Sequence, residues 1–529
     1  MGIYLNPCNE GFQTILNENY VDKTGLIDFV NGTINTPRKL TCFSRPRRFG
    51  KSFAAKMLCA YYDKSCDSRT LFEKLEISER NSFDRYLNKF DVVYLDITRF
   101  ISTTASLKGI VDDIQSKVIK ELREEYPSYV EKQETVLADA LFSVSDKTGN
   151  KFIVIIDECD AIFREAKNDE ALQKGYIQLL RGLFKGGTAT DKTIAAAYMT
   201  GILPIKKYGT ESALTDFREY SMTRPGRLAE YVGFTETEVR HLCDEYQMSF
   251  DEMKSWYDGY SFSRMKHVYS PNSVMNALQE EDILNYWTQT ETFESLKEYI
   301  GMDFDGLKDA IVKMLGGERV SVRISTFQND ITSFKNKNDV LTLLIHLGYL
   351  AYDATRREVY IPNFEVAEAF EDAVSGKEWG AVGEALADSE RLLDATLAED
   401  AEAVAKALEH MHSSVTSVLN YNNEASLSCA ITIAYYTAKR YYSIVRELPA
   451  GKGFADLVFL PHRGTDKPAM MIELKYDKDA DTAIRQIHEN RYDGDLKKYF
   501  GNLILVGINY DKDVKGKDAK KHTCVIERV

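Results

Sequence analysis

The chain has 529 residues, of which 44% are hydrophobic and 11% aromatic, and its formal net charge is -14. This composition excludes a disordered chain, and at about 150 residues per domain the length predicts about three domains. The acidic balance argues against a protein that coats nucleic acid without specificity, although it leaves room for a local nucleic-acid site.

The sequence also disfavours a membrane protein and a protein stabilised by disulfides. No apolar run has the length of a bilayer span, and the N-terminus lacks the basic and then apolar layout of a signal peptide. We therefore expect a cytoplasmic protein with no membrane partner. The eight cysteines are scattered without a C-x-x-C pair, so neither disulfides nor a cysteine zinc site is expected.

The first motif in the chain is RPRRFGKS, residues 45–52. It follows an apolar run at 40–43 that predicts a strand and precedes a segment with helical apolar spacing. Strand, tight loop and helix form the setting of a phosphate-binding loop. There Gly50 lets the backbone approach a phosphate, Lys51 supplies charge to the β and γ oxygens, and Ser52 offers a hydroxyl to Mg²⁺.

Arginines make this loop unusual. Arg45 stands where the G-x-x-x-x-G-K-[ST] pattern has its first glycine, so the match is incomplete. We expect Arg45, Arg48 and Phe49 at the nucleotide, whereas contacts of Arg45, Arg47 and Arg48 with a neighbouring subunit or with nucleic acid stay open. The alternative is a basic loop that caps a helix by chance.

A second motif ends a later strand. Apolar runs at 91–96 and 152–156 predict buried strands, separated by a helical region over about 107–144, and the second run leads into Asp157 and Glu158. At the carboxyl edge of a sheet Asp157 can hold the water shell of Mg²⁺, and Glu158 can orient or deprotonate an attacking water. The pairing with the upstream G-K-S loop strengthens a pattern that is common by itself.

The next predicted strand, 194–199, ends at Thr200 and Gly201. We expect Thr200 between the glutamate and the γ-phosphate, with a plain strand-end turn as the alternative. Any of three downstream arginines could meet a phosphate, in cis or across the interface of a homo-oligomer: Arg218, Arg224 and Arg227.

The middle of the chain is helical and polar. Thr235 predicts a capped helix start, the turn-rich segments 256–260 and 270–273 flank a predicted hairpin, and residues 300–365 suggest a small helical and β subdomain. Long helices are expected over 383–409. His410 and His412 point in different directions on a helix, so a zinc site there is not expected.

The last hundred residues hold a third site. Asp456 enters a predicted strand at 453–460, and Glu473 and Lys475 project from one face of another strand at 469–476. Burying such a charged pair is costly unless it has a function, so we expect Asp456 and Glu473 to bind a divalent cation and Lys475 to position a water. A surface-facing edge strand is the alternative. The basic cluster at 512–521 is interpreted as a solvated loop.

These motifs together resemble a bacterial AAA-ATPase-like family joined to a domain of the PD-(D/E)xK nuclease superfamily. The arginine in place of the first loop glycine is characteristic of that family, and five further segments fall in its order: Val21-Asp-Lys-Thr, Ile156-Asp-Glu, Thr200-Gly201, Gly233-Phe-Thr-Glu and Tyr257-Asp-Gly-Tyr. Cys159 stands where a tyrosine is frequent, and Ser270-Pro271-Asn272 replaces a usual Tyr-Asn-Pro.

The resemblance implies an α/β protein in three parts. Residues 1–230 would form a P-loop ATPase domain of the ASCE or AAA type, a parallel sheet with flanking helices. Residues 231–375 would form a helical lid and a winged-helix-like region, and residues 376–529 a helical linker and a restriction-endonuclease-like domain.

The resemblance also implies ATP and Mg²⁺ as cofactors. The residues for phosphate, Mg²⁺ and hydrolysis would be Lys51, Ser52, Asp157 and Glu158. The nuclease core would be Asp456, Glu473 and Lys475, with Gln486 as a helper on the next helix and Glu424 as a further acid on the preceding one; Tyr492 has the spacing after Gln486 that is common there.

Two main hypotheses follow. The first is an ATP-hydrolysing protein coupled to a Mg²⁺-dependent nuclease that acts on DNA or RNA. The second is an ATP-driven molecular switch whose nuclease-like domain only binds a partner or nucleic acid. A nucleotide-binding scaffold that never hydrolyses is a third possibility, against which the intact Glu158 counts.

Overall fold

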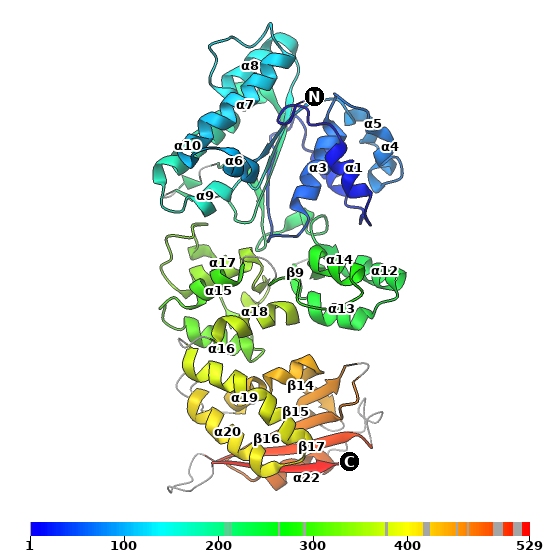
Figure 1. Ribbon diagram of the computed structural model, residues 1–529, viewed down its shortest axis with the longest axis vertical. Coiled ribbons are helices and arrows are strands. Elements are labelled where there is room, and N and C mark those ends of the chain that lie inside the picture. Colours follow the sequence, from blue (N-terminus) through cyan, green and yellow to red (C-terminus); the bar gives the residue numbers. More distant parts are fainter. Residues whose placement is uncertain are drawn as a thin grey trace. The chain divides into compact units, whose positions relative to one another are not determined.

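The chain divides into two units that interleave in sequence. The first comprises Met1–Met248, Asp258–Glu281 and Val322–Val359, and the second comprises Ser249–Tyr257, Asp282–Ser321 and Tyr360–Val529. The computed structural model describes residues 2–205, 207–208, 211–212, 214–262, 265–288, 292–375, 379–415, 424–450, 453–462, 465–489, 501–511 and 521–529 (Figure 1).

A parallel five-stranded sheet forms the core of the first unit. Its order is β2-β3-β4-β1-β7, and each neighbouring pair is parallel. The strands are β1 (Leu40–Ser44), β2 (Asp91–Asp96), β3 (Phe152–Asp157), β4 (Ile194–Gly201) and β7 (Arg218–Tyr220). The largely apolar sequences of β1, β2, β3 and β4 fit strands that are buried in the sheet, which confirms the predicted strands, whereas β7 is a short and mostly exposed edge strand. Since β4 lies between β1 and β3, the ends of these three strands share one sheet edge.

Helices cover both faces of this sheet. Figure 1 shows α1 (Glu10–Leu16) and α3 (Lys51–Tyr62) on one side, and α6 (Ile97–Thr103), α7 (Ile110–Glu125), α8 (Leu137–Thr148), α9 (Ala161–Glu165) and α10 (Glu170–Phe184) on the other. The predicted helical region at 107–144 is thus two main helices, α7 and α8. Their apolar stripes, including Ile114, Val118 and Leu141, pack in one core with Val154 and Ile156 of β3.

Smaller elements complete the first unit. They include α2 (Gly25–Asn31), β8 (Phe234–Thr235), α12 (Glu236–Tyr246), the hairpin strands β9 (Tyr260–Phe262) and β10 (Met265–Tyr269), α14 (Pro271–Gln279), α17 (Lys337–Leu347), β12 (Ala351–Asp353) and β13 (Glu358–Tyr360). Thr235 and Glu238 form a reciprocal capping box at the start of α12, as predicted. The hairpin before residues 270–273 is confirmed.

The second unit contains a mixed sheet, β14-β15-β16-β17-β18. Its strands are β14 (Tyr442–Ala450), β15 (Gly453–Pro461), β16 (Ala469–Tyr476), β17 (Leu503–Tyr510) and β18 (His522–Arg528). Only the pair β16 and β17 is parallel, and α22 (Ala480–Glu489) lies in the crossover between them. Ile484 and Ile487 of α22 pack with Met471 and Leu505 of the sheet.

Seven helices of the second unit precede this sheet in the described part of the chain. They are α13 (Phe250–Tyr257), α15 (Thr292–Ile300), α16 (Leu307–Leu315), α18 (Phe364–Val374), α19 (Gly380–Leu397), α20 (Ala401–Val415) and α21 (Glu424–Ala434). The winged-helix-like character of the middle region and the domain limits near 230 and 375 stay predictions.

Two sequence expectations concern the chain as a whole. None of the described helices combines the length and the apolar content that a bilayer span requires. All eight cysteines are free thiols, and most of them are buried.

Candidate functional site

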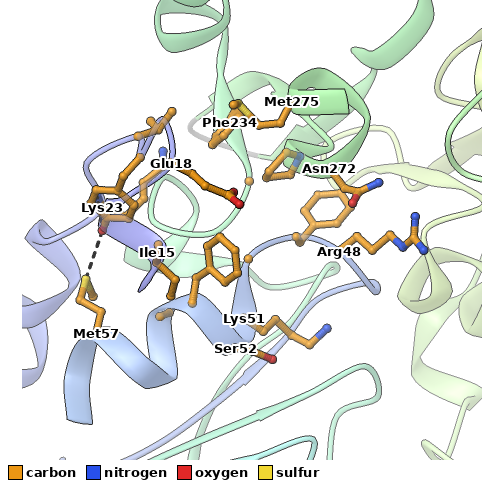
Figure 2. A pocket seen from close by; sticks show the side chains of 18 of the residues that line it. Ile15, Glu18, Lys23, Arg48, Lys51, Ser52, Met57, Phe234, Asn272 and Met275 are labelled. Atoms are coloured by element: carbon orange, nitrogen blue, oxygen red, sulfur yellow. Dashed lines mark hydrogen bonds between the residues drawn. The ribbon is translucent and has the colours of Figure 1, made fainter. Parts of the chain in front are cut away.

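A pocket of about 500 Å³ opens where β1 ends and α3 begins. Figure 2 shows Lys51 and Ser52 at the start of α3 together with Arg48 and Asn272 on its wall. The lining further includes apolar side chains that suit a flat base: Ile15, Tyr20, Val21, Phe53, Met57, Phe234 and Met275. A pocket of this size and mixed lining is suited to a small organic ligand that carries negative charge.

The loop reaches this position through two residues in the left-handed region. Arg48 has φ 66° and Gly50 has φ 87°. A side chain at Gly50 would meet no atom within 4 Å, so the backbone angle rather than space is what favours glycine there. Gly50 precedes the first turn of α3, whose N-terminal amide groups have no partner within the helix and can bind an anion.

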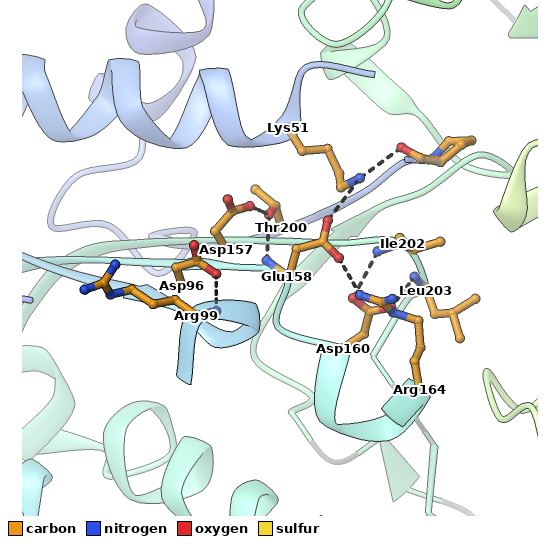
Figure 3. Close-up of polar contacts among 11 residues, drawn as sticks. Lys51, Asp96, Arg99, Asp157, Glu158, Asp160, Arg164, Thr200, Ile202 and Leu203 are labelled. Atoms are coloured by element: carbon orange, nitrogen blue, oxygen red, sulfur yellow. Dashed lines mark hydrogen bonds and ion pairs between the residues drawn. The ribbon is translucent and has the colours of Figure 1, made fainter. Parts of the chain in front are cut away.

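Lys51 is buried and already paired. Its Nζ donates a hydrogen bond to the Pro46 carbonyl at 2.9 Å and lies 3.4 Å from Oε1 of Glu158 (Figure 3). Phosphate oxygens at the start of α3 would compete for this ammonium group with a carbonyl and a carboxylate.

Thr200 joins the ends of β3 and β4. Its hydroxyl donates to Oδ1 of Asp157 and accepts the Glu158 amide N–H at 3.2 Å. Glu158 itself has φ 52°, a strained angle for a residue with a side chain, and the Thr200 contact helps to hold it. The structure therefore brings together Lys51, Asp157, Glu158 and Thr200, as the sequence predicted.

Arg164 and Asp160 belong to the same cluster and were missed by sequence reasoning. Nη2 of Arg164 lies 2.5 Å from Oε2 of Glu158, and its Nε lies 3.0 Å from Oδ2 of Asp160. Burial alone would lower the pKa of Arg164, but the carboxylates of Asp160 and Glu158 raise it. The i,i+4 spacing of Asp160 and Arg164 is the one sequence signal that could have indicated this pair.

Asp160 also connects two strand ends. Its carboxylate accepts the backbone N–H groups of Ile202 at 3.1 Å and Leu203 at 2.9 Å. A Cβ at Gly201 would lie 2.7 Å from Oδ1 of Asp160, so the Thr200-Gly201 sequence needs a glycine at its second position.

Arg45 requires a correction. Its side chain is fully buried, outside the pocket lining, with the guanidinium 4.3 Å from the ring centre of Phe43 and 4.9 Å from that of Phe262. Nη1 donates to the Ser44 carbonyl, and burial lowers the pKa of Arg45 to about 9. The expected nucleotide contact of Arg45 is therefore wrong in this structure, because aromatic packing holds the side chain inside the unit. Arg48, Phe49, Gly50 and Ser52 do line the pocket.

The segment before the phosphate loop gains a role that residue types alone could not show. Nζ of Lys23 donates to both carboxylate oxygens of Glu238, at 2.6 and 2.7 Å, and to the Glu230 carbonyl at 2.8 Å. Asp22 accepts the N–H groups of Thr24 and Glu76. The Lys23 contacts fix the pocket wall formed by residues 18–23 against the start of α12, and the Asp22 contact ties it to Glu76.

The second site lies in the mixed sheet. The register pairs Leu457 with Ile472, and the adjacent Asp456 accepts the Leu474 N–H at 2.7 Å. Nζ of Lys475 donates to Oε1 of Glu473 at 2.9 Å and to the Leu474 carbonyl at 3.1 Å.

Gln486 joins this cluster from α22, since its amide nitrogen donates to Oε1 of Glu473. A Cβ at Gly507 would lie 2.5 Å from the Ala480 carbonyl, so this glycine of β17 is what permits α22 to approach the sheet. Glu473 and Lys475 are 1% and 5% exposed, and β16 lies between two other strands. The alternative of a surface-facing edge strand is therefore wrong.

The donors at this second site fit a hard divalent cation. The carboxylates of Asp456 and Glu473, supplemented by a peptide carbonyl and water, are the oxygen ligands that Mg²⁺ takes. Within the described ranges no three His, Cys, Asp or Glu side chains gather as a metal site, so oxygens of other kinds would have to complete the coordination. The side chain of Glu424, Tyr492 and residues 512–520 lie outside the described residues.

The three arginines considered for a neighbouring subunit are exposed and lie outside the pocket lining. Arg218 is in β7, and Arg224 and Arg227 follow it. The structure does not select one of them.

Comparison with known proteins gives two family matches. Residues 9–210 match the model of a family described as predicted AAA-ATPase, and residues 423–518 match that of the PD-(D/E)XK nuclease superfamily. No curated protein matches the sequence. Among solved structures, the chain is similar to the Aeropyrum pernix ORC2 protein in its ADPNP and ADP complexes, with 10% identity, a TM-score of 0.32, and coverage of 70% of this chain and 99% of that chain.

Proposed function

Since the chain joins an AAA-ATPase-like domain at residues 9–210 to a PD-(D/E)XK nuclease superfamily domain at residues 423–518, we propose that it hydrolyses ATP with Mg²⁺ and cleaves DNA or RNA phosphodiesters. One observation carries the proposal. Each domain holds its own cluster of charged side chains that are largely buried, one around Lys51 and Glu158 and the other around Glu473 and Lys475.

For ATP hydrolysis, Lys51 and the amide groups at the start of α3 bind the β and γ phosphates. Ser52 and Asp157 are the residues that would hold Mg²⁺, which when bound neutralises charge on the phosphate oxygens. Glu158 orients the attacking water and accepts its proton, while Thr200 holds the Asp157 carboxylate and the Glu158 backbone in place.

For phosphodiester cleavage, Asp456 and Glu473 are the residues that would hold the divalent cation, which when bound polarises the scissile phosphate. Lys475 positions the attacking water from the same face of β16. Gln486 fixes the Glu473 carboxylate through its amide hydrogen bond. The burial of Glu473 and Lys475 supports this reading because paired charges inside a sheet are retained where they serve chemistry.

The experiment measures ATP turnover and cleavage of single- and double-stranded DNA and RNA by the full chain, with and without ATP. Lys51→Ala should abolish turnover, and Glu473→Ala and Lys475→Ala should abolish cleavage. Matched controls are Lys174→Ala and Glu390→Ala, at exposed positions of α10 and α19. Full cleavage by the purified Glu473→Ala and Lys475→Ala proteins would contradict the nuclease proposal.

A second candidate function is an ATP-driven switch whose nuclease-like domain only binds a partner or nucleic acid. The net charge of -14 favours the form of this switch that binds a partner other than nucleic acid, because sustained contact with a polyanion is easier for a basic surface. ATP turnover that is lost in Lys51→Ala, combined with no cleavage of any tested nucleic acid in Mg²⁺ or Mn²⁺, would select the switch. In either case a homo-oligomer would allow Arg218, Arg224 or Arg227 to reach a neighbouring nucleotide.

A further inference from the structure

The Glu158 carboxylate is bound at both oxygens. Oε1 lies 3.4 Å from Nζ of Lys51, and Oε2 lies 2.5 Å from Nη2 of Arg164 (Figure 3). Two cations therefore share the side chain that the proposed hydrolysis uses as its base.

The two cations differ in how they are held. Lys51 lies on the pocket wall, where its flexible side chain can turn to a phosphate. Arg164 is outside the pocket lining, on α9, and the Asp160 carboxylate fixes its Nε at 3.0 Å. Asp160 is itself fixed by the amide groups of Ile202 and Leu203. A phosphate would thus draw Lys51 away from Glu158 and leave the contact of Arg164 intact.

We infer that Arg164 is a positioning residue for ATP hydrolysis: it holds Oε2 of Glu158, so that Oε1 faces the attacking water once Lys51 has turned to the phosphates. This inference rests on the proposed ATPase function. Arg164 is not among the residues that line the pocket, so it acts through Glu158. A glutamate side chain has several rotatable bonds, and anchoring one oxygen removes most of the unproductive orientations of the other.

A purely structural role makes different predictions. If Arg164 only braced the turn after β3 through its i,i+4 pair with Asp160, its loss would change stability, and it would do so equally whether or not residue 158 is a glutamate. A positioning role requires the effect on turnover to depend on Glu158. A double-mutant cycle between the two positions separates these readings.

The test measures kcat and KM for ATP, the affinity for a fluorescent ATP analogue and the midpoint of thermal unfolding on the full chain. The variants are Arg164→Met, Arg164→Lys, Glu158→Gln and the double variant Glu158→Gln/Arg164→Met. Arg38→Met, at an exposed arginine before β1, is the matched control.

We expect Arg164→Met to lower kcat about tenfold to hundredfold with KM and analogue affinity within about twofold. Arg164→Lys should recover only part of the loss. The lysine keeps a positive charge near Glu158, but one ammonium cannot bridge two carboxylates as a guanidinium does. In the Glu158→Gln background Arg164→Met should leave the residual turnover unchanged.

Two results would overturn the inference while leaving the ATPase proposal standing: wild-type kcat in Arg164→Met, or a loss of the same factor in both backgrounds. An absence of ATP turnover in the wild-type chain would instead overturn the ATPase proposal, and wild-type turnover in Glu158→Gln would overturn the role of Glu158 as the base, and the inference with it. If Arg164→Met does not fold, Arg164→Lys decides: a reduced kcat at an unchanged unfolding midpoint supports the inference, and an unchanged kcat refutes it.

Discussion

Nζ of Lys51 lies 3.4 Å from the carboxylate of Glu158, so the residue proposed to bind phosphate and the residue proposed to activate water form an ion pair. Lys51→Ala removes the cation, and we expect ATP affinity to fall about tenfold or more, the loss of a charge-assisted hydrogen bond. Titration with a fluorescent ATP analogue measures this affinity, with Lys174→Ala as the control. Unchanged affinity in Lys51→Ala would show that the nucleotide binds elsewhere.

Thr200 should matter through its hydroxyl group. Thr200→Val keeps the shape of the side chain but removes the donor to Asp157 and the acceptor for the Glu158 N–H. We expect ATP turnover to fall about tenfold or more and stability to fall by about 1 to 3 kcal/mol, because a buried carboxylate oxygen and an amide lose their partner. Thr200→Ser should recover most of the turnover. A Thr200→Val protein with wild-type turnover would assign Thr200 to a plain strand end.

Gly201 is predicted to tolerate no side chain. Gly201→Ala places a Cβ 2.7 Å from Oδ1 of Asp160, and we expect a loss of about 1 to 3 kcal/mol of stability from this overpacking. The control is Gly109→Ala, because an added Cβ there meets no atom within 4 Å. Thermal unfolding measures both variants, and equal midpoints would contradict the prediction.

Loss of the Gln486 side chain should slow nucleic-acid cleavage without abolishing it. Gln486→Ala removes the hydrogen bond to Oε1 of Glu473, and we expect slower nucleic-acid cleavage, about tenfold, at an unchanged fold. Gln486→Glu places a second carboxylate beside Glu473 and should be slower still at neutral pH. Cleavage assays at matched Mg²⁺ concentrations compare the two, and the reverse order would contradict the proposed geometry.

His346 should make stability depend on pH. Burial, and secondarily the charge of Arg45, lowers the pKa of His346 to about 3, against about 6.5 for an exposed histidine. Between these values the unfolded chain binds more protons than the folded one, so this contribution is full above about pH 6.5 and is lost as pH falls toward 3. At pH 5 the loss amounts to about 2 kcal/mol.

The measurement is the unfolding midpoint at pH 7 and pH 5 for wild type, His346→Gln and His241→Gln, the last being an exposed control. The drop between the two pH values should shrink in His346→Gln and persist in His241→Gln. Equal drops in all three proteins would show that other groups dominate this range.

Local sequence patterns predicted the elements that hold the sites. β1, β3 and β4 are continuous apolar runs that end in a polar motif. Local sequence alone therefore predicted both these strands and the site residues at their ends. The placement of β4 between β1 and β3 is a long-range property that no local run contains.

The wrong expectation for Arg45 and the unpredicted role of Arg164 also come from long-range or unusual geometry. Arg45 resembles a phosphate ligand in sequence, but Phe262, far along the chain, covers its guanidinium. Arg164 contacts Glu158 across a turn in which Glu158 takes a left-handed backbone angle. Contacts that depend on distant residues or on one unusual dihedral angle leave little trace in composition or periodicity.

The close approach of Asp160 to Gly201 has a consequence for sequence divergence. The carboxylate that ties Ile202 and Leu203 to the turn after β3 also occupies the space of a side chain at position 201. Neither position can drift independently: a larger residue at 201 becomes acceptable only where 160 has already become smaller. In an alignment of relatives the two columns should covary, and a relative with alanine at the position of Gly201 should lack the aspartate.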